Sequence, residues 1–123
     1  MAVTQFWDSD VITLPAGANL TARTRVKLNT SGQVVAASVT EPSVGYVDER
    51  GGVSGQPCTV RLNGKPRVGI AAGQIEVGDK LWAAASGKVN DVDAGSGIHV
   101  GTALTAAGAD NEEVVFLPPD YVS

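Results

Sequence analysis

The chain has 123 residues, a formal net charge of -4 and a single cysteine. This length fits one domain with one core, and the acidic balance argues against nucleic acid as a partner because phosphate binding needs a surplus of Lys and Arg. One cysteine excludes an intrachain disulfide and a cysteine metal cluster. The first residues lack the basic and apolar regions of a secretory signal, and no run reaches the roughly 18 apolar residues of a membrane span. We therefore expect a protein that is not exported and has no contact with a membrane.

The first half of the chain reads as short strands separated by turns. Residues 24–28 alternate apolar with charged side chains, which is typical of a half-buried strand. Residues 29–32 (NTSG) supply turn chemistry and residues 34–36 resume an apolar run, which predicts a hairpin. After a break at 41–42 (EP), residues 44–47 begin another strand.

A second hairpin is predicted around Asn63-Gly64. Residues 58–62 alternate again and lead directly into this dipeptide, which is a strong hairpin signal. A three-residue loop here would set Val60 opposite Val68 and keep the apolar side chains on one face. We therefore expect the strands on either side of residues 63–66 to pair with each other.

The second half repeats the first with an offset of 55 or 56 residues. The matched positions are 14–17 with 70–73, Leu20 with Ile75, 25–26 with 80–81, 31–34 with 86–89, 44–45 with 100–101, and 59–62 with 114–117. Chance is the alternative, because a chain rich in Ala, Gly and Val aligns easily with itself. Duplication is favoured because the matches fall on turn glycines and on strand-like apolar positions.

The predicted fold is therefore all-β, a small barrel or sandwich of two similar strand-turn-strand units with little helix. We divide the chain into an N-terminal arm (1–10), one β-domain (11–119) and a C-terminal tail (120–123). The repeat units span about 12–64 and 68–119. Three of the six aromatic side chains lie outside these units, namely Phe6, Trp7 and Tyr121.

The residues indicate no enzyme, no cofactor and no metal. His99, the only histidine, is interpreted as an ordinary strand residue, and Cys58 as a small core residue. The segment 90–97 (NDVDAGSG) is similar to a calcium loop, but Gly95 falls where the third oxygen ligand is expected and Thr102 replaces the closing Glu. A solvated acidic turn explains this segment better.

Two surface features have both a plain and a functional interpretation. Arg23, Arg25 and Lys27 would line one strand face, either as a solvated outer face or as a contact for an acidic partner surface. Trp82 is matched to Lys27 and so is expected to face outward, where its ring could stack on a sugar. A single exposed tryptophan is a weak carbohydrate signal.

The two units, RVKLNTSGQVVAASVTEPSVG and KLWAAASGKVNDVDAGSGIHVG, resemble the small decoration, or cement, proteins of tailed-bacteriophage capsids. The shared sequence pattern is an apolar strand, a Ser/Gly turn, a short valine-rich strand and then Val-Gly followed by a hydrophobic residue. Here it spans Val26 to Val47 and, less cleanly, Leu81 to Ala103. The resemblance implies a β-domain made in the host bacterial cytoplasm, usually a homotrimer, that sits on the outer capsid surface and binds the major capsid protein.

The resemblance also implies an N-terminal arm that orders against the shell, although many arms in the family are longer and richer in proline. The capsid-binding residues expected on this basis are Val3, Gln5, Phe6, Trp7 and Asp8. A possible interface comprises Arg23, Arg25, Lys27 and Tyr121. The expected function is to cement neighbouring capsomers of the expanded head against internal DNA pressure. The alternatives are a carbohydrate- or receptor-binding β-module, which predicts exposed aromatics on one concave face, and a subunit of a non-viral assembly.

Overall fold

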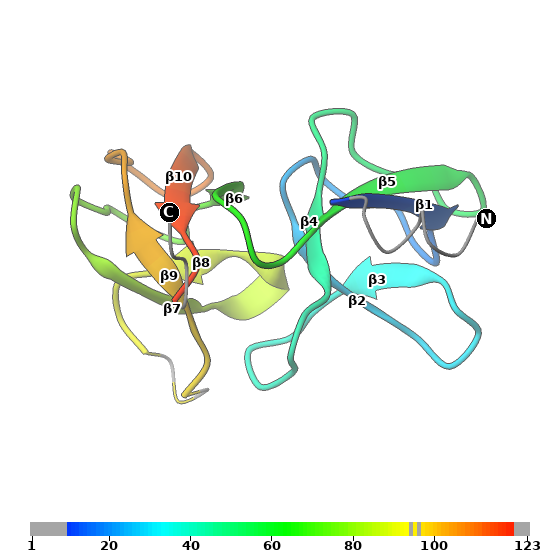
Figure 1. Ribbon diagram of the computed structural model, residues 1–123, viewed down its shortest axis with the longest axis horizontal. Coiled ribbons are helices and arrows are strands. Elements are labelled where there is room, and N and C mark those ends of the chain that lie inside the picture. Colours follow the sequence, from blue (N-terminus) through cyan, green and yellow to red (C-terminus); the bar gives the residue numbers. More distant parts are fainter. Residues whose placement is uncertain (1–9, 94, 96, 120–123) are drawn as a thin grey trace.

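The described residues form ten β-strands in two groups of five, and the two groups lie side by side in Figure 1. The structure is a computed structural model that describes residues 10–93, 95 and 97–119. The first five strands are β1 (Val11–Pro15), β2 (Arg25–Leu28), β3 (Val34–Ala36), β4 (Gly45–Val47) and β5 (Pro57–Leu62). The second five are β6 (Arg67–Ile70), β7 (Lys80–Ala83), β8 (Val89–Asn90), β9 (His99–Ala103) and β10 (Glu113–Leu117). We call the two groups the N-lobe (residues 10–62) and the C-lobe (residues 67–119).

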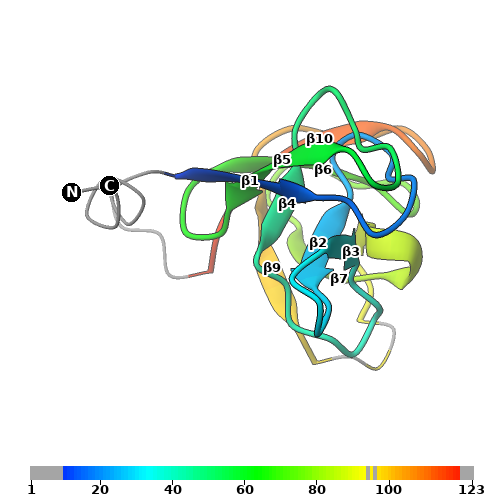
Figure 2. The ribbon, with the colours of Figure 1, turned by 90° about the vertical axis from the view of Figure 1, so that its right-hand side faces the viewer.

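Each lobe is one five-stranded antiparallel sheet, and the two sheets have the same strand order. The N-lobe order is β1-β5-β4-β2-β3, and the C-lobe order is β6-β10-β9-β7-β8. When the strands of each lobe are counted in chain order, both sheets therefore have the spatial order first, fifth, fourth, second, third. Figure 2 shows the pairing of β1 with β5 from the side. The prediction of an all-β chain made of two similar units is confirmed.

Neither sheet is a closed barrel. Among the described residues, the two edge strands of the N-lobe approach each other only at an isolated parallel bridge between Ala16 and Val34. The corresponding bridge in the C-lobe joins Ala71 and Val89. A closed barrel needs a continuous ladder around its circumference, so the barrel form of the prediction is wrong for both lobes.

A matched turn shows how far the two lobes agree in backbone geometry. The N–H of Arg23 donates to Val47 O at 3.0 Å, and the N–H of Gly78, 55 positions later, donates to Ala103 O at 2.8 Å. Both residues have positive φ, 69° for Arg23 and 91° for Gly78. Glycine adopts this region at little cost, whereas an arginine there is strained.

The Val-Gly pairs of the two units are explained by a close approach of backbones. A Cβ built on Gly45 would lie 2.2 Å from Arg61 O, and one built on Gly101 would lie 2.0 Å from Leu117 O. At these two glycines, strands β4 and β9 therefore lie so close to the paired strands β5 and β10 that any side chain would overlap a carbonyl group. The signature that suggested the repeat is thus a steric requirement of each sheet.

Each lobe has its own hydrophobic core. The N-lobe core is built mainly of valines together with Cys58, which is 1% exposed, as predicted. Burial raises the pKa of the Cys58 thiol. The C-lobe core includes Leu81, Val114 and Phe116, but it also contains Tyr46, which comes from β4 of the N-lobe. Tyr46 therefore joins the two cores.

The predicted hairpin at Asn63-Gly64 is wrong. Strand β5 pairs with β1 and β4, and β6 pairs with β10, so Val60 lies opposite Ile12 instead of Val68. Residues 63–66 instead carry the chain from one lobe to the other, as the green segment in Figure 1 shows. The backbone does bend at residues 63–65, with Gly64 at a φ of 106°, but strand β5 pairs on both sides with strands of its own lobe.

Helix is limited to one short element in the described part of the chain. A 3-10 turn spans Ala85–Gly87 and begins at the last of three consecutive alanines, residues 83–85. Within the described residues, no helix has the length and apolar character needed to cross a membrane.

Candidate functional site: the seam between the lobes

A pair of buried rings holds the two lobes together along what we call the seam. The Tyr46 and Phe116 rings have centroids 5.3 Å apart and an interplanar angle of 70°, an edge-to-face arrangement. Both side chains are almost fully buried, with 4% and 1% exposed. Such pairs contribute about 0.5–1.5 kcal/mol beyond the burial of their area. The seam is therefore a packed contact that fixes how the lobes sit against each other.

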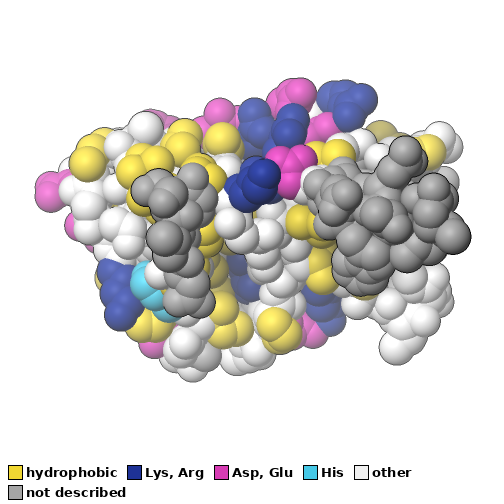
Figure 3. Space-filling view, in the orientation of Figure 1, with side chains coloured by type: hydrophobic (Ala, Val, Ile, Leu, Met, Phe, Trp, Pro, Cys, Tyr) yellow, Lys and Arg dark blue, Asp and Glu magenta, His cyan; other side chains and the backbone are white. Residues whose placement is uncertain are grey.

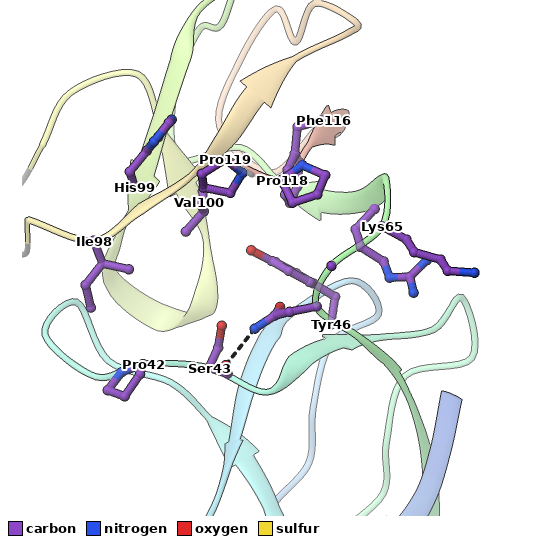
Figure 4. Close-up of a pocket in the computed structure, with 13 residues that line it drawn as sticks. Pro42, Ser43, Tyr46, Lys65, Ile98, His99, Val100, Phe116, Pro118 and Pro119 are labelled. Carbon is purple, nitrogen blue, oxygen red and sulfur yellow. Dashed lines mark hydrogen bonds between the residues drawn. The ribbon is translucent and has the colours of Figure 1, made fainter. Parts of the chain in front are cut away.

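Next to this ring pair the seam opens into a groove of about 380 Å³, which we call the seam groove (Figure 4). Its walls come from both lobes. Pro42 and Ser43 of the β3–β4 loop face Ile98 and Val100 across it, and Pro118 closes one side. Much of the groove lining is thus apolar, and the groove could not form in either lobe alone.

The hydroxyl group of Tyr46 points into the seam groove in Figure 4. Among the described residues, no group forms a hydrogen bond with the Tyr46 hydroxyl. The hydrogen bond beside it joins other atoms, because Asn63 Nδ2 donates to Ser43 O at 2.7 Å. Burial raises the pKa of Tyr46 far above its usual value, although the nearby Arg25 opposes the shift. The hydroxyl is therefore neutral and faces the groove, and Arg25 Nε is the one buried side-chain nitrogen or oxygen of the described residues that has no hydrogen-bond partner.

Two cationic side chains line the opposite side of the groove. Arg67 donates from Nε to Leu62 O at 2.8 Å and from Nη1 to Pro66 O at 3.1 Å, and it is 8% exposed. Burial lowers the pKa of Arg67, and Asp10 opposes this. The Asp10 carboxylate is a loose partner, 3.8 Å from Arg67 Nη2 and 3.9 Å from Lys65 Nζ. This side of the groove is positive.

The predicted basic stripe is not an exposed face, because Arg25 is fully buried. Its Nη1 donates to Glu41 O at 2.9 Å and its Nη2 to Ser38 O at 2.6 Å, while its Nε has no partner. Burial lowers its pKa. The expectation failed because both faces of β2 are covered: Val26 packs in the N-lobe core, and Gly87 of the C-lobe lies against the backbone of Arg25.

The other two members of the stripe are paired with acidic groups of the same chain. Arg23 lies 3.7 Å from Glu49 and 3.3 Å from Glu113, and the second of these pairs crosses the seam. Lys27 forms an ion pair with Glu41. Figure 3 shows basic and acidic side chains gathered together over the middle of the molecule. A contact of Arg23 or Lys27 with an acidic partner stays a prediction.

The expected arm residues Val3, Gln5, Phe6, Trp7 and Asp8, together with Tyr121, lie outside the described residues. Their roles stay predictions. Asp10, which we assigned to the arm, belongs to the folded body: its carbonyl oxygen accepts from Leu62 N at 2.8 Å.

The described aromatic side chains do not form an exposed cluster on a concave face. Tyr46 and Phe116 are buried, and Trp82 lies on β7 beside His99, with ring centroids 5.5 Å apart. Lys80 Nζ sits 4.8 Å from the Trp82 ring centroid and covers part of the face that a sugar would use. The described residues also contain no group of three or more His, Cys, Asp or Glu side chains placed to hold a metal ion.

Sequence reasoning did not identify the seam groove. Tyr46 and Val100 were noticed only as strand residues, and no local pattern relates them, because they meet through the packing of the lobes. The only available signal was Tyr46 itself, a large ring in a chain with 5% aromatic residues.

Comparisons with known proteins agree with this architecture. The chain matches the phage cement protein family over residues 4–118. A similar solved structure is the N base of the head fiber gp8.5 of bacteriophage phi29, with a TM-score of 0.72 and 20% sequence identity over 88% of this chain and 92% of that chain. At this identity the likeness shows the fold alone. A search of curated proteins finds no match. Because the family match spans nearly the whole chain, the protein belongs to the phage cement protein family and is a structural protein of a phage head.

Proposed function

We propose that this protein binds the outer surface of an expanded phage capsid and cements neighbouring capsomers, which stabilises the head against internal DNA pressure. The observation that carries the proposal is the family match over residues 4–118. The proposed function is adhesion to the capsid shell and not catalysis. A ligand that binds the expanded shell and not its precursor stabilises the expanded state by mass action.

The body of the protein suits this role because its two lobes are fixed to each other. The Tyr46–Phe116 contact and the Arg23–Glu113 ion pair both cross the seam. A clamp with a rigid body transmits load between its attachment points without first reorganising internally.

The N-terminal arm is the proposed attachment to the major capsid protein, through Val3, Gln5, Phe6, Trp7 and Asp8. Burial of its apolar side chains contributes roughly 25 cal/mol per Å². The arm can also add a strand to an exposed sheet edge of the shell, a mode that depends on backbone groups more than on particular side chains. The arm is proposed to span residues 1–10, and the carbonyl oxygen of Asp10 at its end accepts a hydrogen bond from Leu62 N of the N-lobe.

Self-association would multiply weak contacts. A homotrimer that spans several shell subunits converts the second and third contacts into intramolecular events with a high effective concentration. Light scattering during size-exclusion chromatography tests this directly, since a trimer has three times the chain mass of 12.5 kDa. A mass of one chain at micromolar concentration would contradict the trimer.

The decisive experiment is co-sedimentation with expanded heads from a phage that lacks this gene. We expect the full chain to pellet with the heads and a chain lacking residues 1–9 to stay in the supernatant, with unchanged circular dichroism. Trp7→Ala should weaken binding, whereas Trp82→Ala serves as the matched control, because Trp82 lies on β7 of the body. A full-length chain that does not pellet would refute the proposed function, and a truncated chain that still pellets would refute the arm.

A further inference from the structure

The two lobes pack head to tail, because the patches that meet at the seam are not equivalent parts of the two lobes. Tyr46 of β4 lies against Gly69 of β6, where a built Cβ would be 3.7 Å from Tyr46 Cε2. Gly87 of the 3-10 turn lies against β2, since its Cβ would meet Thr24 Cγ2 at 2.3 Å and Arg25 O at 2.8 Å. The N-lobe therefore contributes the outer face of β2 and β4, and the C-lobe contributes β6 and the 3-10 turn.

The C-lobe has the same outer face as the N-lobe, but there it is exposed. Arg25 of β2 pairs with Tyr46 of β4, and their counterparts Lys80 of β7 and Thr102 of β9 pair in the same way. The N-lobe pair is 0% and 4% exposed at the seam, whereas both residues of the C-lobe pair are exposed. The face of β7 also carries Trp82, one of the two tryptophans of the chain. We call Lys80, Trp82 and Thr102 the open face.

The N-lobe in turn has a counterpart of the C-lobe surface that packs at the seam. The isolated parallel bridges of the two lobes align Gly69 with Leu14, and the Ser-Gly turns align Gly87 with Gly32, at φ values of 71° and 77°. Gly87 is buried, whereas Gly32 is exposed and its Cβ would meet none of the described residues within 4 Å. Leu14 is half-buried. We call Leu14, Ser31 and Gly32 the open end.

A contact between two different patches leaves one patch of each kind unused. Between identical subunits such a contact is heterologous, and its repetition gives a closed ring or an open filament. The two lobes behave as two similar subunits joined in one chain, so the open face and the open end are the pair left for the next copy. Their sizes are complementary in the reverse sense: the seam packs Tyr46 against Gly69, and the outer contact places Thr102 against Leu14.

We propose that copies of this chain associate head to tail, with the open face of one copy packed on the open end of the next in the geometry of the seam. The occupant of the open face is the N-lobe of a second copy, and Trp82 and Leu14 supply the apolar centre of the contact. Three copies then form one closed ring of lobes. This inference rests on the self-association included in the proposed function, and it names the surfaces involved.

The first test is Thr102→Arg in the full chain, measured by light scattering during size-exclusion chromatography. Thr102 is exposed in the single chain, so the variant should keep the circular dichroism spectrum of the wild type. The contact would bury an unpaired charge, and we expect the dissociation constant of the assembly to rise about 100-fold or more. Thr40→Arg is the matched control, because Thr40 is exposed in the β3–β4 loop outside both surfaces, and this variant should stay a trimer. A Thr102→Arg chain that stays a trimer would overturn the inference.

The second test determines the direction of the contact by cross-linking between chains. Because Gly87 lies beside Arg25 at the seam, the proposed contact places Ser31 of one copy near Lys80 of the next. A short bismaleimide should join Ser31→Cys chains to Lys80→Cys chains in a mixture and should join neither variant to itself. The wild type is the control for Cys58, which is 1% exposed and should not react. Cross-links between two Lys80→Cys chains would show a symmetric contact and overturn the inference.

A chain that carries both cysteines tests closure of the ring. Its cross-linked products should stop at three chains, and a longer ladder would show an open filament and overturn the ring.

These outcomes separate the inference from the proposed function. A wild type with the mass of one chain would overturn the trimer and the head-to-tail contact together, while co-sedimentation with heads still decides attachment to the capsid. If Thr102→Arg stays a trimer and loses only its binding to heads, the open face contacts the shell. The inference then fails while the proposed function stands.

Discussion

Arg23 lies at a position where the second lobe has glycine, and this predicts an unusual order of stability among variants. The φ of Arg23 is 69°, in the left-handed region, where a residue with a Cβ is less stable by about 1–2 kcal/mol. Its ion pairs with Glu49 and Glu113 involve carboxylates that are 58% and 60% exposed, so each contributes only about 0.2–1 kcal/mol. The strain and the two pairs are thus of similar size.

Replacing Arg23 with alanine removes both pairs and keeps the strain, so Arg23→Ala should lower the free energy of unfolding by about 0.5–2 kcal/mol. Arg23→Gly also loses the pairs but relieves the strain, partly offset by the larger entropy of glycine in the unfolded chain. We expect Arg23→Gly to be more stable than Arg23→Ala by about 1 kcal/mol, the reverse of the usual order for these two residues. Gly78→Ala is the matched control: its Cβ would meet nothing within 4 Å, so a loss of about 1 kcal/mol there measures strain alone.

The assay is urea unfolding followed by circular dichroism, with the free energies obtained by linear extrapolation at a common m-value. High salt should lower the stability of the wild type relative to both variants and leave the difference between the glycine and alanine variants unchanged, since only the ion pairs are screened. The reasoning is refuted if Arg23→Ala is as stable as Arg23→Gly, or if Gly78→Ala is neutral.

Two further predictions concern the close packing at Gly45 and the hydrogen-bonded carboxylate of Glu41. Gly45→Ala should lower the free energy of unfolding by about 3 kcal/mol or more, because its Cβ overlaps Arg61 O. The control is Gly73→Ala, whose Cβ meets only an atom 3.6 Å away, so this variant should stay within about 1 kcal/mol of the wild type. Equal urea midpoints for the two variants would contradict the close approach of Gly45 to Arg61 O. Hydrogen bonds from Lys27 and Ser38 lower the pKa of Glu41 to about 2, so the stability that this carboxylate contributes is fully present above about pH 4.3 and is lost as the pH falls toward 2. Glu41→Gln should therefore flatten the acid limb of a stability curve measured by thermal unfolding, and an acid limb identical to that of the wild type would argue against the pair.

Local patterns in the sequence were sufficient to place the strands. The alternation at 24–28 and 58–62 corresponds to β2 and β5, and the Val-Gly pairs mark β4 and β9. These features could be predicted because a steric requirement at one residue, such as Gly45, leaves a mark in the sequence at that same residue.

Pairing between distant segments could not be predicted in the same way. Asn63-Gly64 has the chemistry of a hairpin turn, but β5 satisfies both of its edges with β1 and β4, which leaves β6 to pair elsewhere. The burial of Arg25 was missed for a related reason. A charged residue in an alternating strand indicates an outer face only when that face meets water, and here the C-lobe covers it.

The register of the repeat was also one residue off near the end of the chain. We matched 59–62 with 114–117, whereas the carbonyl groups beneath the two glycines belong to Arg61 and Leu117, 56 positions apart. The run Val114-Val115-Phe116-Leu117 is apolar throughout, so it has no alternation from which a register can be determined. The seam groove could not be predicted from the sequence for a simpler reason. Its walls are distant in the sequence and meet only when the two lobes pack together.

The outer edge of β1 has a consequence for crowded surfaces. Strand β1 ends the N-lobe sheet, and Ala16 turns its N–H inward to Gln56 O at 2.9 Å, so the nitrogen of the preceding Pro15 faces outward. Proline has no hydrogen to offer there, which removes one donor from the exposed rim. Where many copies lie close together, the missing donor of Pro15 disfavours edge-to-edge strand pairing between copies, which is the contact that leads to fibres.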